Sequence, residues 1–130
     1  MKNVVGMSAQ YTSISVEDMQ AFLGRAFRVM HPTPHDLRGE MVIDLALNDE
    51  KTVGIRVWTS IPSGASHGAA VGADAIRVQF FNFGRGYPME KGKAPIVKRT
   101  QGWRDNLKDR IEDVIEKYDD NEEYWNSRGK

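Results

Sequence analysis

The longest periodic stretch of the chain is residues 98–118, KRTQGWRDNLKDRIEDVIEKY. Its apolar residues recur at spacings of three and four, the stripe of a helix that buries one face. The residues of this stripe are Trp103, Leu107, Ile111, Val114, Ile115 and Tyr118. Thr100 stands where an N-cap residue is expected. The pattern therefore predicts a long C-terminal helix.

A shorter helix is predicted at residues 16–23. Ser15 and Asp18 resemble a capping box, with Asp in place of Glu or Gln, and Gly24 is a natural stop. Alternating apolar positions predict strands at 25–30, 40–47, 53–61 and 75–83. We expect an α+β fold, in which a four-stranded antiparallel sheet packs on the long C-terminal helix and the short N-terminal helix.

The composition indicates an ordinary soluble globular protein. The 130 residues are 40% hydrophobic and 28% charged, and the length predicts a single domain over 1–130. Residues 1–13 are a candidate flexible N-terminus, and residues 119–130 form an acidic C-terminal end. With no cysteine, the chain has no disulfide or thiolate metal site, and we expect a cytoplasmic protein. It shows neither a membrane-spanning run nor a convincing signal peptide.

The zero net charge hides a segregation of charge. Up to Arg110 there are 15 Lys and Arg against 11 Asp and Glu, whereas the rest has 3 against 7. The long helix is basic at its start and acidic at its end, opposite to the preference of the helix dipole. The basic start therefore suggests a role other than helix stability.

One face of the two best strands interleaves basic and aromatic residues. Aromatic rings stack on bases and cations neutralise phosphates, so this pattern suits single-stranded nucleic acid. The alternatives are a face buried under a helix, an inverted alternation with the long helix on the aromatic face, and a partner site rimmed by arginines. The residues of this face are Arg56, Trp58, Arg77, Gln79, Phe81 and Phe83.

A basic segment follows this face along the chain. Closely spaced cations can track a phosphate backbone, although a solvated surface with local ion pairs would look similar. Its residues are Arg85, Lys91, Lys93, Lys98, Arg99, Arg104, Lys108 and Arg110.

Catalysis and metal binding find little support. His31, His35 and Asp36 lack a ligand spacing, and no catalytic motif is present. A small metal-dependent nuclease would need converging carboxylates, for which the candidates are Asp44, Asp49, Glu50 and Asp74. We expect no enzyme activity, no metal and no cofactor.

The segments GIRVWTSI, DAIRVQFF and VKRTQGWRDNLKDRIEDVIEKY make the second half of the chain resemble the archaeal ThermoDBP single-stranded-DNA-binding proteins. This resemblance implies a basic cleft lined with aromatic residues that binds single strands without sequence preference. The positions that could fill these roles are Trp58, Arg77, Phe81 and Trp103. No leucine-rich dimerisation segment follows the helix, although a homodimer stays open.

The prediction is a non-catalytic module that binds single-stranded DNA or RNA, with DNA favoured, and that makes no membrane contact. The alternatives are a protein-interaction module that uses the same face, and the small nuclease. The predicted binding residues are Arg56, Trp58, Arg77, Gln79, Phe81, Phe83, Arg85, Lys91, Lys93, Lys98, Arg99, Trp103 and Arg104.

Overall fold

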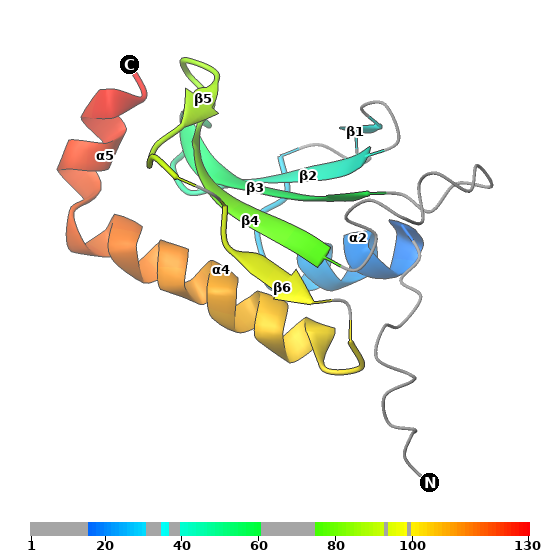
Figure 1. The fold of residues 1–130 in the computed structure, drawn as a ribbon. Coiled ribbons are helices and arrows are strands. Elements are labelled where there is room, and N and C mark those ends of the chain that lie inside the picture. Colours follow the sequence, from blue (N-terminus) through cyan, green and yellow to red (C-terminus); the bar gives the residue numbers. More distant parts are fainter. Residues whose placement is uncertain (1–15, 31–34, 37–39, 61–74, 93, 99) are drawn as a thin grey trace, which may run out of the picture.

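The computed structural model describes residues 16–30, 35–36, 40–60, 75–92, 94–98 and 100–130 (Figure 1). Within these residues, six antiparallel strands form one sheet in the order β1-β2-β3-β4-β5, and β6 also pairs with β4. The strands are β1 (His35–Asp36), β2 (Glu40–Ala46), β3 (Val53–Ser60), β4 (Ala75–Asn82), β5 (Tyr87–Pro88) and β6 (Ile96–Lys98). The predicted flexible N-terminus at 1–13 lies outside the described residues.

Two helices cover one face of this sheet. Figure 1 shows α2 (Val16–Ala26) and α4 (Trp103–Asp120) on the same side of the strands, while α5 (Glu122–Arg128) rises beside the end that carries β5. The predicted class is confirmed: an antiparallel sheet packs on a long C-terminal helix, with a short N-terminal helix.

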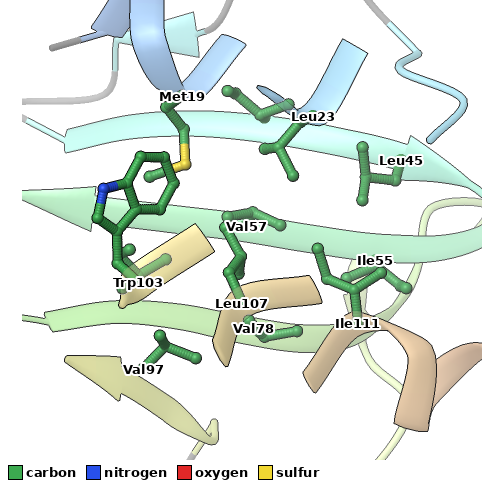
Figure 2. Packing of buried hydrophobic residues seen from close by; sticks show 12 residues of the cluster. Met19, Leu23, Leu45, Ile55, Val57, Val78, Val97, Trp103, Leu107 and Ile111 are labelled. Carbon is green, nitrogen blue, oxygen red and sulfur yellow. The ribbon is translucent and has the colours of Figure 1, made fainter. Parts of the chain in front are cut away.

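The core lies between the two helices and the aliphatic face of the sheet (Figure 2). The alternation is therefore the predicted one, with the aliphatic side inward. Fully burying one such side chain contributes about 1.5–3 kcal/mol. The buried residues of this cluster are Met19, Leu23, Ile43, Leu45, Ile55, Val57, Ile76, Val78, Val97, Trp103, Leu107 and Ile111.

The segment 25–30 differs from its prediction as a strand. The helix α2 continues past Gly24 to Ala26, and the N–H of Phe27 donates to the carbonyl of Leu23 at 2.9 Å. Only Val29 forms a bridge, to Leu45 of β2. The alternation of Phe27 and Val29 reflects packing against the core, because both side chains lie against its cluster.

The start of α4 also differs from its prediction. Gly102 occupies the N-cap position without a side-chain cap, so Thr100 is not the N-cap residue. The carbonyl of Thr100 accepts from the N–H of Trp103 at 3.0 Å, which closes a turn before the helix. No side chain therefore caps the first turn of α4, where the basic residues begin.

Asn121 separates α4 from α5, and hydrogen bonds of polar side chains hold α5 against the sheet. Asn126 Oδ1 accepts from the Tyr118 hydroxyl and from Asn48 Nδ2, each at 2.9 Å. Asn82 Nδ2 donates to the carbonyl of Arg128 at 2.7 Å. These bonds join α4 and α5 to the two turns at this end of the sheet. We call residues 121–130 the C-terminal clamp.

The clamp also closes a second apolar cluster. The ring of Trp125 lies 4.7 Å from that of Phe80, and Tyr118 is buried beside them. Burial raises the pKa of the Tyr118 hydroxyl, an effect that the hydrogen bond to Asn126 partly opposes and that nearby carboxylates such as Glu122 reinforce. The tyrosine is therefore held in its neutral form.

Candidate functional site

The strand register aligns the predicted binding residues in rows on the face that α2 and α4 leave uncovered. We call this face the outer face. One row runs from Val42 through Trp58 and Arg77 to Ile96, across four strands. Cross-strand neighbours lie about 4.5–5.5 Å apart, so their side chains are in contact range. Sequence analysis therefore placed Trp58 and Arg77 on the correct face.

Trp58 and Arg77 form a partly exposed pair on this face. The Arg77 guanidinium lies 5.6 Å from the centre of the Trp58 ring, and both residues are partly exposed. Such a contact contributes about 0.5–1 kcal/mol at an exposed site. Within the described residues, Arg77 forms no ion pair and the buried Nε1 of Trp58 donates no hydrogen bond. This pair therefore offers a cation and an aromatic surface.

In the next row, the charges of Asp44 and Arg56 balance each other. Asp44 is buried and receives two bonds from Arg56, Nε to Oδ1 at 2.9 Å and Nη2 to Oδ2 at 3.1 Å. The same guanidinium lies 4.4 Å from the Phe81 ring centre and 5.5 Å from that of Phe83. A bidentate pair of this kind fixes both partners. Arg56 thus positions the neighbouring rings and contributes little free charge to a ligand.

The two phenylalanines differ in what they expose. Phe81 is buried beneath Arg56, whereas Phe83 keeps a partly exposed ring 5.0 Å from that of Phe81. Phe83 packs directly on the backbone of β3: a Cβ at Gly54 would lie 2.7 Å from Phe83 Cε2. Only glycine leaves room for this contact. Phe83 remains a candidate for base stacking, and Phe81 supports it from below.

Trp103 does not belong to the outer face. It is 2% exposed, lies in the core and meets the edge of the Phe22 ring at 5.5 Å. Arg104 covers it, with the guanidinium 4.5 Å from the ring centre. Because α4 packs on the opposite side of the sheet, Trp103 cannot stack on a base there, and Arg104 does not join the cations of the outer face. We remove both from the proposed interface.

The remaining predicted cations are dispersed. Arg85 lies in the turn after β4, where its Nε donates to the backbone oxygen of Lys130 at 2.6 Å. Lys91 is exposed in the connection between β5 and β6, and Lys93 and Arg99 lie outside the described residues. Lys98 is exposed on β6, next to the row of Arg77. Among the described residues of this basic segment, the structure brings only Lys98 to the outer face.

Ile96 and Asp44 are the site residues that the sequence analysis missed as contributors to this face. Ile96 is 47% exposed beside Arg77, within a strand too short to give an alternation signal. Asp44 could have been found, because a hairpin turn centred on residue 50 pairs it with Arg56. Gln79 lies on the predicted face as the cross-strand partner of Arg56, and it is partly exposed.

Among the described residues, the carboxylates proposed for a nuclease do not converge. Asp44 binds Arg56, and Asp49 pairs with Arg28 at 2.8 Å. Asp74 lies outside the described residues, as do His31 and the side chain of Asp36. Across the described part of the chain, no group of three His, Asp or Glu side chains could hold a metal ion.

Comparison with protein-family models, with curated proteins and with solved structures finds no match to this chain. The resemblance to ThermoDBP proteins therefore stays a prediction. None of the helices in the described residues has the length and apolar character needed to cross a membrane.

Proposed function

We propose that the outer face binds single-stranded nucleic acid, without catalysis and without sequence preference. One observation carries the proposal: Arg77 lies over the partly exposed ring of Trp58, on a sheet face that α2 and α4 leave uncovered. Exposed rings on an open sheet face are a common way to stack unpaired bases, and each stacked base contributes about 1–3 kcal/mol.

Each component of the site has a separate role in this proposal. Trp58 and Phe83 stack bases, while Arg77 and Lys98 neutralise phosphates. The two cations occupy diagonal positions on β4 and β6, which places their backbones about 7–8 Å apart. Gln79 lies between the rings and can exchange hydrogen bonds with any base edge.

The number of free cations predicts the salt dependence. With two phosphates neutralised, the logarithm of the association constant should fall with the logarithm of salt concentration with a slope of about −1.4, because each single-strand phosphate contributes about −0.7. This is shallower than a cleft formed by the whole basic segment would give. The difference arises because Arg85, Lys91 and Arg104 lie away from Arg77 and Lys98.

The test is fluorescence anisotropy of labelled single-stranded DNA, single-stranded RNA and duplex DNA across a salt series. Arg77→Gln should weaken single-strand binding and reduce the slope by about 0.7. The matched control is Arg25→Gln, since Arg25 is exposed in the last turn of α2 on the other side of the sheet. It should leave both the affinity and the slope unchanged.

Trp58→Ala tests stacking and should weaken binding about 5- to 150-fold, the equivalent of about 1–3 kcal/mol. Trp58→Phe retains a ring and should recover most of the affinity if the loss comes from stacking. Equal effects of Arg77→Gln and Arg25→Gln, or no binding to any oligonucleotide at low salt, would reject the proposal.

The second candidate is a protein-docking role for the same face, favoured by the exposed side chain of Ile96 in the row of Trp58 and Arg77. Apolar side chains beside arginine are common in protein interfaces. If the folded protein binds none of the three oligonucleotides, this alternative is favoured.

A further inference from the structure

The strand β6 presents an unused backbone edge. The carbonyl of Pro95 accepts from the N–H of Val78 at 3.1 Å, and Val97 lies opposite Ile76. In an antiparallel pair, alternate residues direct both backbone groups toward the partner strand. The N–H and C=O groups of Ile96 and Lys98 therefore point away from β4. No described residue is seen to bond them.

A groove borders this edge. It has a volume of about 380 Å³ and lies between β6 and α4. Ile96, Val97 and Lys98 line one wall, and the other residues of the lining are Thr100, Asn106, Asp109, Arg110 and Asp113. An edge strand beside a groove is the arrangement in which proteins take up an extended peptide as an added strand.

A second hollow of about 500 Å³ lies further along α4, and Asp113 lines both. Together the two linings hold five carboxylates and three cations, whereas the groove beside β6 alone holds two of each. Two of the three cations are already paired. Arg110 lies 3.7 Å from Asp113, and Lys117 pairs with Glu90. The carboxylates of the two linings are Glu90, Asp109, Asp113, Glu116 and Asp120.

We propose that this groove binds an extended basic segment of a partner protein, which adds as a strand to the outer edge of β6. The backbone of the segment would bond the outward groups of Ile96 and Lys98. Alternate side chains would point toward α4, where cations meet Asp109, Asp113 and Glu116. The intervening side chains would be apolar and extend the outer face beside the exposed Ile96.

The charges select this occupant over two others. A nucleic acid would bring its phosphates against the carboxylates of α4, which is unfavourable. A second copy that paired its own β6 here would bring together two pairs of hollows that each hold more carboxylates than cations. A basic peptide alone matches both the backbone edge and the charge. The proposal is independent of the proposed function, because the groove and the outer face use different charged residues of the chain apart from Lys98.

The experiment uses two labelled ten-residue peptides with blocked ends, one alternating Lys and Val and the other alternating Glu and Val. The Lys/Val peptide should bind the intact chain at low salt, with backbone amide shifts in NMR spectra centred on Ile96 and Lys98. Equal binding of the Glu/Val peptide, or shifts confined to the outer face around Trp58, would overturn the proposal.

Ile96→Pro is the decisive variant. Proline removes the N–H that points outward and leaves the bonds between β6 and β4 in place, as edge strands permit. This variant should bind the Lys/Val peptide at least about five-fold more weakly, the equivalent of one hydrogen bond. Ile96→Thr retains the N–H and should bind within about two-fold of the parent. Equal binding by both variants would refute strand addition.

A separate variant tests how much the carboxylates contribute to peptide binding. Asp109→Asn combined with Glu116→Gln should weaken binding of the Lys/Val peptide and reduce its salt dependence, while oligonucleotide binding stays unchanged. Conversely, Arg77→Gln should leave peptide binding unchanged. These two results separate a failure of this proposal from a failure of the proposed function.

Discussion

Asn126→Ala tests whether the C-terminal clamp depends on one shared acceptor. In the intact protein, Asn126 Oδ1 accepts from both the Tyr118 hydroxyl and Asn48 Nδ2. The substitution leaves the buried tyrosine hydroxyl without a partner, whereas Asn48 keeps its bond to Thr52 Oγ1 at 2.9 Å. An orphaned buried hydroxyl costs about 1–3 kcal/mol, so we expect a loss of about 2 kcal/mol. The melting temperature should fall by about 6–10 °C.

Urea denaturation followed by circular dichroism measures this loss as a lower midpoint with an unchanged slope. The double variant Tyr118→Phe/Asn126→Ala supplies the decisive comparison, because phenylalanine removes the orphaned hydroxyl. It should be no less stable than Asn126→Ala alone. Asn106→Ala, at an exposed position of α4, should change stability by less than about 0.5 kcal/mol. Losses that simply add in the double variant would refute the shared-acceptor reasoning.

Three further predictions concern the core, a glycine contact and high pH. Leu107→Ala should cost about 2–5 kcal/mol, whereas Lys108→Ala at the exposed neighbour should cost less than about 0.5 kcal/mol, both measured by urea denaturation. Gly84→Ala places a Cβ 1.9 Å from the carbonyl oxygen of Gly129, so the amide of Gly129 should exchange faster with deuterium; unchanged exchange would contradict this contact. The pKa of Tyr118 is raised above 10.0, so the folded state retains the hydroxyl proton longer than the unfolded state. Stability should therefore fall as pH rises above about 10 and through the folded pKa, and Tyr118→Phe should lack that part of the decline in denaturation measured at several pH values.

Periodicity predicted the long elements because each one buries an uninterrupted face. Strands β2, β3 and β4 alternate over seven or eight residues, and α4 maintains its stripe from Trp103 to Tyr118. The strands β5 and β6 have two and three residues, too few for alternation to be recognised. Their positions depend on pairing with β4, which no local pattern reports.

The site shows the same division between local and long-range information. Alternation placed Trp58 and Arg77 on one face, but the ion pair of Arg56 depends on Asp44, a partner twelve residues away. Trp103 was a member of the apolar stripe of its helix, and that pattern correctly predicted a buried side chain. Its proposed role in stacking conflicted with this pattern, and the core packing decides against it.

The C-terminal clamp has a consequence for the order of folding. Its bonds join Asn48 to Asn126 and Asn82 to Arg128, which are separated by 78 and 46 residues. Contacts between distant residues form only after the intervening chain has lost much of its entropy. The hairpin of β2 and β3 can form early from near neighbours, whereas the clamp closes late. Destabilising substitutions in the clamp should therefore accelerate unfolding and leave the folding rate nearly unchanged.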